Sequence, residues 1–266
     1  MKSKAHFQAR DYLDGLSTAG RYCFTSQDAG NALGVSQDAV KLALNRLRHK
    51  GEVASPARGF YVIVPPEYRA LSCLPADQFI PALMQQAKMP YYAGLLSAAQ
   101  YHGAAHHRPQ EFQVMLGKPR SPIECGKVRV TFYVCKNISE IPVQHINTPR
   151  GTVAVSTPEA TAFDLIGYES KIGGLDAVAT VLVELSEKMD SKKLAEIAPK
   201  MPLLWVQRLG YLLEHIGEEA RAKYLKNYVR EHAVNARALQ PSSPEEGFPR
   251  NNDWKLIINA DIEAET

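Results

Sequence analysis

The chain contains no uninterrupted apolar run of about 18 residues, the length that a membrane-spanning helix needs. Its first residues, MKSKAHFQARDYL, also lack the apolar segment of a secretion signal. Only four of the 266 residues are cysteine, and they are scattered without the Cys-X-X-Cys spacing of a metal or redox site. These absences predict a protein of the reducing cytoplasm, with no membrane span and no disulfide framework.

Motifs of common enzyme chemistry are absent too, including a nucleophile elbow, a glycine-rich phosphate loop and the Gly-Ser pattern of nucleotidyltransferases. Asp164 and Glu169 are near each other on an expected helix, where acidic side chains usually face solvent. His102, His106 and His107 are close in sequence, but no Cys, Asp or Glu accompanies them at helical spacing. We therefore predict no catalytic residue, no metal site and no cofactor.

Length and charge suggest how the chain is divided. A chain of 266 residues with 45% hydrophobic residues is long enough for two folded units and a tail. Residues 1–70 carry ten basic against six acidic side chains, whereas the chain from residue 241 onward carries two basic and six acidic ones. We predict a DNA-binding domain over residues 1–65, an α+β domain over 66–240, and an acidic extension with a final strand over 241–266.

Two short helices joined by a tight turn are predicted between residues 25 and 49. Thr25 or Ser26 can cap the first helix, because a side-chain oxygen accepts a hydrogen bond from a free backbone N–H there. Gly34 can leave that helix, because glycine readily adopts a positive φ, and Ser36 can cap the second helix. This order is typical of a helix-turn-helix.

The second helix of this pair has two distinct faces at 100° per residue. Its apolar arc consists of Val40, Ala43, Leu44 and Leu47. The other arc consists of Gln37, Asp38, Lys41, Asn45 and Arg48. Amide side chains pair with adenine, and basic side chains pair with guanine or phosphate, so this face is suited to reading DNA. An isolated solvated helix would show the same polarity. The elements around this helix must therefore decide between a DNA-reading face and an ordinary solvated surface.

A hairpin follows these helices. The sequence EVASPARGFYVIV predicts two short strands that turn near residues 55–59, with Arg58 close to the tip. With a first helix over residues 5–16, the order becomes that of a winged helix-turn-helix, in which Arg58 would enter a minor groove or touch a phosphate. A winged helix used only for protein contacts is the alternative, and the positive charge of residues 1–70 argues against it.

The predicted DNA interface combines the second and third helices with the wing. Its members are Thr25, Ser26, Gln27, Ser36, Gln37, Asp38, Lys41, Asn45, Arg48 and Arg58. One short helix reads only a few base pairs, so useful specificity needs two copies. We therefore expect a double-stranded operator with inverted or direct repeats, bound by a homodimer or cooperatively by monomers.

The larger region predicts an antiparallel sheet with several helices. The strand-like runs are EFQVML, KVRVTFYVC, PVQHINT and GTVAVS. Helices are expected over residues 92–101, from Thr157-Pro158-Glu159 onward, and over 175–185, 191–198, 202–216 and 218–231, with a final strand at WKLIIN. A second basic surface is formed by Lys118, Arg120, Lys127 and Arg129. It is either an ordinary solvated sheet face or a contact for nucleic acid or an acidic partner.

Three stretches carry a family resemblance: YYAGLLSAAQYHGAAHHRP, VSTPEATAFDLIGY and NNDWKLIINADIE. With the winged helix before them, they make residues 5–262 resemble the AbiEi antitoxins of bacterial type IV toxin–antitoxin and phage-defence (abortive infection) systems. The chain departs from the family pattern at Ala160 and Ala162, where a longer aliphatic run is expected. The resemblance implies a transcriptional autorepressor whose DNA contacts lie at Ser36–Arg48 and Arg58. It also implies that the second half counters a nucleotidyltransferase toxin.

Two other classes of protein stay open at this point. A winged-helix repressor controlled by a small-molecule effector is one, because Tyr91, Tyr92, Tyr101 and Trp205 could line a pocket in the C-terminal domain. Aromatic residues at helical spacing belong more often to a core. The other is a nucleic-acid enzyme with a winged-helix targeting domain, which would turn over substrate without a partner.

Overall fold

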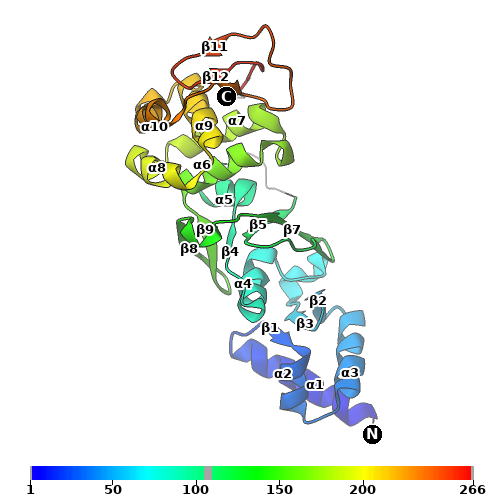
Figure 1. Ribbon diagram of the computed structural model, residues 1–266. Helices are drawn as coiled ribbons and strands as arrows, with labels where there is room; N and C mark the ends of the chain where they lie inside the picture. The colour runs from blue at the N-terminus through cyan, green and yellow to red at the C-terminus, as the bar shows by residue number, and fades with distance from the viewer. Residues whose placement is uncertain (1, 105–109, 265–266) are drawn as a thin grey trace. The chain divides into compact units, whose positions relative to one another are not determined.

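The structure is a computed structural model that describes residues 2–104 and 110–264, so His106 and His107 lie outside the described residues. The chain forms two compact units (Figure 1). The first comprises Met1–Tyr91, Gln110–Lys136 and His145–Ala154, and the second comprises Tyr92–Pro109, Asn137–Gln144 and Val155–Thr266. No helix in the described part of the chain is both long and apolar enough to cross a membrane.

The N-terminal part of the first unit is a winged helix. Its elements are α1 (Lys2–Thr18), β1 (Cys23–Thr25), α2 (Ser26–Leu33), α3 (Gln37–His49), β2 (Val53–Ala57) and β3 (Phe60–Ile63). The three strands form one antiparallel sheet in the order β1-β3-β2 (Figure 1). Thr25 pairs with Phe60, and Val53 pairs with Ile63. The predicted helix-turn-helix and hairpin are confirmed.

The helix ends are capped as the sequence indicates. The Asp28 N–H donates to Thr25 Oγ1 at 3.0 Å, and the Thr25 N–H donates to Asp28 Oδ2 at 2.9 Å, so the two residues form a capping box for α2. Gly34 leaves α2 with a φ of 60°. Ser36 Oγ accepts from the Ala39 N–H at 3.3 Å and caps α3. These local interactions determine where α2 begins and ends and where α3 begins.

The sheet of the winged helix is covered on both faces. One face packs on α1 and α3, with Phe24, Leu44 and Leu47 among the buried side chains. The other face, with Phe60 and Val62, shares a second core with α4 (Ala76–Ala87) and the strands that follow. The sequence did not predict α4, because Pro81 interrupts its apolar pattern. The chain reaches α4 through a 3₁₀ helix, η1 (Pro66–Leu71), after two prolines end β3.

Three further strands belong to the first unit: β5 (Phe112–Leu116), β6 (Ile123–Cys125) and β7 (Val128–Val134). β6 and β7 form an antiparallel hairpin, whereas β5 and β7 are parallel, with Phe112 opposite Val130. The chain runs along β5, continues to the edge strand β6 and returns through β7, which lies between them. The α+β fold class is confirmed, but the prediction of an antiparallel sheet was wrong. The sheet is mixed, because two reversals of direction make β7 parallel to β5.

The second unit is mainly helical. Its helices are α5 (Leu95–Tyr101), α6 (Pro158–Gly167), α7 (Gly174–Ser186), α8 (Ser191–Ile197), α9 (Leu203–His215) and α10 (Glu219–His232), with 3₁₀ turns η2 (Ile138–Glu140), η3 (Glu169–Lys171) and η4 (Ala198–Lys200). The strands β4 (Tyr91–Ala93), β8 (Val143–Thr148) and β9 (Gly151–Ser156) are divided between the units, and residues 92–93, 143–144 and 155–156 belong to the second. Ala93 pairs in parallel with Val155. The helix predicted from residue 92 starts later, because the two tyrosines extend into β4.

The C-terminal segment folds onto the helices of the second unit. It forms a small sheet of β10 (Arg237–Ala238), β12 (Leu256–Ile257) and β11 (Arg250–Asn251), in that order. The predicted strand WKLIIN is reduced to Leu256–Ile257, because Lys255 has a φ of 51° and belongs to a turn. Trp254 is completely buried.

Candidate nucleic-acid interface

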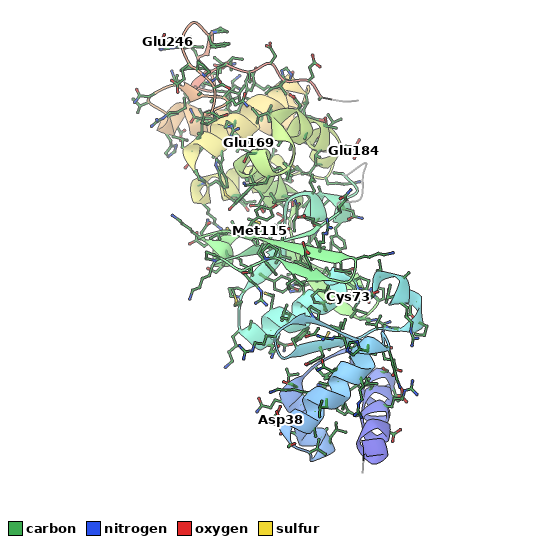
Figure 2. The ribbon with its side chains drawn as sticks, turned by 90° about the vertical axis from the view of Figure 1, so that its right-hand side faces the viewer. Asp38, Cys73, Met115, Glu169, Glu184 and Glu246 are labelled. Atoms are coloured by element: carbon green, nitrogen blue, oxygen red, sulfur yellow. The ribbon has the colours of Figure 1, made fainter. Side chains whose placement is uncertain are left out.

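The third helix presents the predicted polar face to solvent. Its buried residues are Val40, Ala43, Leu44 and Leu47, all within the core of the winged helix. The predicted contact residues Gln37, Asp38, Lys41, Asn45 and Arg48 are all exposed, as are Leu42, Arg46 and His49. Asp38, labelled in Figure 2, lies at the outer side of α3 near its first turn. The helix therefore offers amide and basic side chains on one side while its apolar side holds it in place.

The charges on α3 are free to meet a ligand. Lys41 Nζ lies 3.6 Å from Asp38 Oδ1, but the two side chains are 66% and 91% exposed. An ion pair this exposed is weak and easily exchanged for another partner. Arg46, Arg48 and His49 occupy the last turn, so positive charge is concentrated at that end of the helix. This arrangement suits a polyanion.

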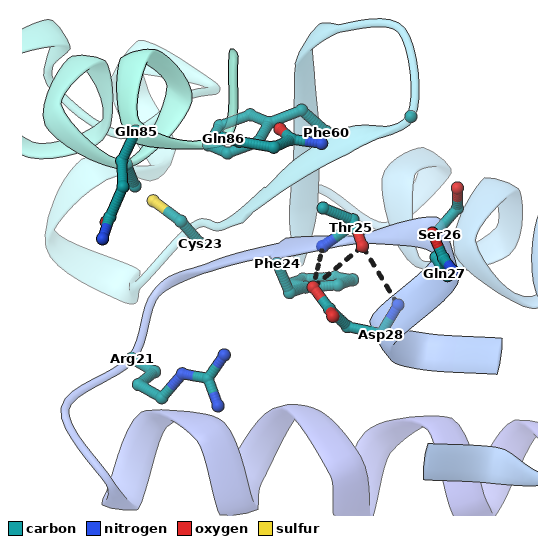
Figure 3. Close-up of a pocket in the computed structure, with 12 residues that line it drawn as sticks. Arg21, Cys23, Phe24, Thr25, Ser26, Gln27, Asp28, Phe60, Gln85 and Gln86 are labelled. Carbon is teal, nitrogen blue, oxygen red and sulfur yellow. Dashed lines mark hydrogen bonds between the residues drawn. The ribbon is translucent and has the colours of Figure 1, made fainter. Parts of the chain in front are cut away.

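The start of α2 and the tip of the wing are brought together. The Ser26 N–H donates to the Gly59 carbonyl at 3.0 Å, beside the exposed Arg58. Gln27 is exposed on the first turn of α2, whereas the Thr25 hydroxyl is engaged in the capping box drawn in Figure 3. Thr25 is therefore placed to position the helix through its cap, with Ser26, Gln27 and Arg58 at the surface.

Sequence reasoning missed the contribution of α4 to this neighbourhood. Gln85 and Gln86 on α4 line a depression together with residues 25–28 of the winged helix (Figure 3). The contribution was missed because α4 was not predicted, since a proline inside an apolar run argues against a helix. Pro81 is accommodated within α4 nevertheless.

The second basic surface lies on the β5–β7 part of the first unit. Lys118, Lys127 and Arg129 are exposed, and the Lys127 backbone N–H donates to the Leu71 carbonyl at 2.8 Å. Arg120 is half-buried, with its guanidinium 5.4 Å from the centre of the Phe132 ring. Desolvation of this group lowers the pKa of Arg120. Three of the four predicted residues thus keep their charges in solvent.

Three of the four aromatic residues considered for an effector pocket have different partners. Tyr92 is 1% exposed and donates from its hydroxyl to Asp164 Oδ1 at 3.3 Å. The Tyr91 hydroxyl accepts from the Ala154 N–H at 3.4 Å. Trp205 stacks edge-on against Tyr168, with ring centres 6.0 Å apart. The contacts of Tyr92 are those of a core residue, whereas Trp205 is partly buried.

His102, the one described histidine of the sequence cluster, is held by its neighbours. Its Nε2 lies 2.8 Å from the Ser156 carbonyl, and the Gln144 amide lies 3.3 Å from its Nδ1. Burial lowers the pKa of His102, since desolvation disfavours the charged imidazolium. Within residues 2–104 and 110–264, no three His, Cys, Asp or Glu side chains gather as metal ligands would.

Two sequence comparisons agree with this geometry. A winged helix with an exposed polar third helix is typical of DNA-binding transcriptional regulators, and residues 17–64 match the family model described as a transcriptional regulator, AbiEi antitoxin. Residues 92–215 match the model of the AbiEi antitoxin C-terminal domain. The chain therefore belongs to the AbiEi antitoxin family, as its sequence motifs indicated. A search of curated protein sequences gives no match.

Solved structures add information on the fold. The crystal structure of the Rv2827c protein of Mycobacterium tuberculosis aligns with a TM-score of 0.67 at 19% identity, over 94% of this chain and 91% of that one. This likeness supports the same fold across nearly the whole chain. The solution structure of the antibiotic-resistance factor ANT(2″)-Ia aligns with a TM-score of only 0.27 at 13% identity, over 57% of this chain and 88% of that one. That score is too low to indicate a shared fold.

Gly30, a glycine of α2 that faces Gln37 of α3, tests the role of Gln37 without disturbing the core. A Cβ at Gly30 would lie 2.8 Å from Gln37 Nε2, the end of an exposed side chain that can move. We expect Gly30→Ala to leave the free energy of unfolding unchanged or raise it by up to about 1 kcal/mol, because alanine favours helix. Operator affinity should fall several-fold as Gln37 is displaced.

Chemical denaturation and a DNA-binding titration measure the two effects. Gly15→Ala is the matched control, since a Cβ there meets nothing within 4 Å and α1 carries no predicted base contact. Equal operator affinity for Gly30→Ala and wild type would show that Gln37 does not contact the operator.

A buried carboxyl in the second unit predicts a pH dependence of stability. Burial raises the pKa of Asp164 to about 7, and the Tyr92 hydroxyl opposes this shift only in part. Among the described residues, Asp164 Oδ2 has no hydrogen-bond partner. An unfolded aspartate has a pKa of about 3.9, so the folded state binds more protons between these values. Stability should therefore fall as the pH rises from about 4 to 7, by a few kcal/mol at most.

Asp164→Asn should remove this part of the pH dependence, since the amide can still accept from Tyr92 but does not ionise. Denaturant unfolding at pH 5 and pH 8 provides the measurement. The difference between the two values should be smaller in the variant, and an equal difference would show that Asp164 titrates normally.

Proposed function

We propose that the chain is a transcriptional autorepressor and antitoxin of a type IV toxin–antitoxin system, with a nucleotidyltransferase toxin as its functional partner and no catalytic activity of its own. The first unit binds operator DNA, with α3 in the major groove, the start of α2 on the backbone and Arg58 of the wing on an adjacent groove or phosphate. The carrying observation is that Gln37, Lys41, Asn45 and Arg48 are exposed on α3, whose other side carries its buried apolar residues.

The operator is proposed to contain repeats, because one α3 reads only a few base pairs. Two copies of the chain bind it, either as a homodimer or cooperatively as monomers. The second basic surface at Lys118, Arg120, Lys127 and Arg129 is proposed as a contact for nucleic acid or for an acidic partner during toxin neutralisation. Its three exposed basic side chains support this proposal.

A growth-rescue experiment tests the antitoxin role. The chain is co-expressed with the nucleotidyltransferase toxin gene that the proposal places beside its own gene, and growth is compared with that of cells expressing the toxin gene alone. The full chain is needed, because removing residues 1–70 would take Phe60 and Val62 out of a core shared with α4. Rescue supports the antitoxin role, and failure of an abundant, folded chain to rescue would contradict it.

The DNA-binding role is tested separately with the chain's own promoter. A fluorescence titration with the promoter duplex should give much tighter binding than a scrambled duplex of equal length. Equal affinity for both duplexes would leave only non-specific binding and would contradict a role as operator-specific repressor.

A further inference from the structure

A polar groove in the first unit runs along β1, between the winged helix and α4. It consists of two adjoining depressions of about 550 and 360 Å³, which share Arg21, Cys23, Ala82 and Gln85 in their walls. Figure 3 shows the wider one, with Gln85 and Gln86 of α4 facing the strand that carries Cys23. Both volumes are within the range of about 300–1,000 Å³ that small-molecule sites occupy.

The narrower depression contains a buried acceptor without a partner. Gln78 is 7% exposed, and its Nε2 donates to the Tyr68 hydroxyl at 2.9 Å. Its Oε1 is buried and has no hydrogen-bond partner among the residues that the structure describes. A buried acceptor without a donor destabilises the folded chain, so a hydrogen bond from a ligand would be stabilising.

A buried cationic donor lines the same depression. The Arg150 guanidinium lies 3.4 Å from the centre of the Tyr22 ring, and its Nη2 contacts Glu67 Oε1 at 2.9 Å. Its Nε is buried and, within the described part of the chain, makes no hydrogen bond. The aromatic contact and the ion pair hold the guanidinium in one orientation at the wall of the depression.

The charge of the narrower depression favours an anion. Arg21 and Arg150 line it, and its lining residues include no acidic side chain. Cys23 adds no negative charge, since burial raises the pKa of its thiol to about 12. A carboxylate would satisfy a guanidinium N–H through a charge-assisted hydrogen bond, and a nearby N–H would satisfy the free Gln78 oxygen.

From these groups we propose that the groove binds a small carboxylate that also carries an N–H donor, which is the chemistry of an amino acid or an N-acyl amino acid. The carboxylate meets the guanidinium groups of Arg21 and Arg150, and the N–H meets Gln78 Oε1 after the amide side chain turns toward the groove. The rest of the ligand lies along β1 toward the wider depression, against Ala82 and Gln85.

Occupancy of the groove affects the DNA-binding elements. The wider depression is lined by residues 25–28, which form the cap and first turn of α2, and by Gly59 at the tip of the wing. A ligand that extends there contacts the same backbone that positions α2 and Arg58. The change in DNA affinity rests on the proposed DNA-binding function, whereas binding of the ligand itself does not.

Isothermal titration calorimetry of the full chain without DNA tests the site. The probes are the free amino acids and their N-acetyl derivatives, each titrated separately. At least one should bind saturably with a stoichiometry near one. Gln78→Leu, which removes the free acceptor, should weaken that binding about tenfold or more. Absence of saturable binding by every probe would overturn the proposal.

A blocking variant keeps the test decisive if Gln78→Leu does not fold. Gln85 is exposed and lines both depressions, so Gln85→Trp should fill the groove and abolish binding. Ala87→Trp is the matched control, because Ala87 is exposed on the same helix and is not among the lining residues. Binding that survives Gln85→Trp would place the ligand elsewhere and overturn the assignment.

The effect of the ligand on DNA binding is measured by repeating the promoter titration in the presence of a saturating concentration of the probe that binds. A change in operator affinity of threefold or more that Gln85→Trp abolishes supports coupling between the groove and α2. An unchanged affinity would overturn the coupling while leaving the calorimetric result for the site intact. Failure of promoter binding itself would contradict the proposed function and not the ligand site.

Discussion

Replacing Lys41 and Arg48 together by alanine should weaken operator binding by about 10- to 100-fold and lower its dependence on salt. Both side chains are exposed on α3, and neither is held by a buried partner that its loss would leave unsatisfied. Each phosphate contact contributes about 0.9 to the slope of log K against log salt concentration, so the slope should fall by about 1.8 if both residues contact phosphates. Stability should change little, since surface substitutions usually stay within about 0.5 kcal/mol.

The measurement is a set of promoter titrations between about 50 and 200 mM salt. Lys223→Ala with Arg230→Ala is the matched control, because it removes two exposed positive charges from α10 in the second unit. The control should leave the slope nearly unchanged. If the α3 variant keeps the wild-type affinity and slope, the assigned face of α3 does not contact DNA.

The same pair of variants separates the two proposed activities. If neutralisation of the toxin resides outside the winged helix, the Lys41→Ala, Arg48→Ala chain should still rescue growth. Expression from a promoter other than its own keeps the amount of protein constant, because loss of autorepression would otherwise change it. Loss of rescue by the folded, abundant variant would show that DNA binding and protection depend on one surface.

The winged helix was predictable because its signals are local. The capping box at Thr25 and Asp28, the positive φ of Gly34 and the cap at Ser36 each involve residues at most three positions apart, so sequence spacing determines them. The exposed face of α3 followed from the helical period alone. For these reasons the predicted DNA-contacting residues could be named before the structure was known.

The parts that escaped prediction depend on long-range packing. The parallel pairing of β5 with β7 has no local signal, because β7 reaches its place only after the chain has passed through β6. Helix α4 forms despite Pro81 because Phe79, Ile80 and Leu83 are buried against the wing sheet and β5–β7. Tertiary burial of this size outweighs a poor local pattern. The groove beside α4 was invisible in the sequence for the same reason.

The C-terminal segment carries the largest expected effect on stability. Trp254 is fully buried, and its indole N–H donates to Glu214 Oε2 at 2.7 Å. Its ring lies over Gly210 of α9, so closely that a Cβ at Gly210 would be 2.0 Å from it. Trp254→Ala should lower the free energy of unfolding of the second unit by about 3–5 kcal/mol, through lost burial and the cavity left behind.

Gly210→Ala should also destabilise the chain, by about 1–3 kcal/mol or more, because the added methyl group collides with the indole. In the Trp254→Ala background the same change should be neutral or slightly stabilising, since the cavity accepts the methyl group and alanine favours helix. Denaturant unfolding of the four chains of this double-mutant cycle measures the coupling. Additive effects would mean that Trp254 does not occupy the space over Gly210, and the docking of residues 237–257 on α9 would then be wrong.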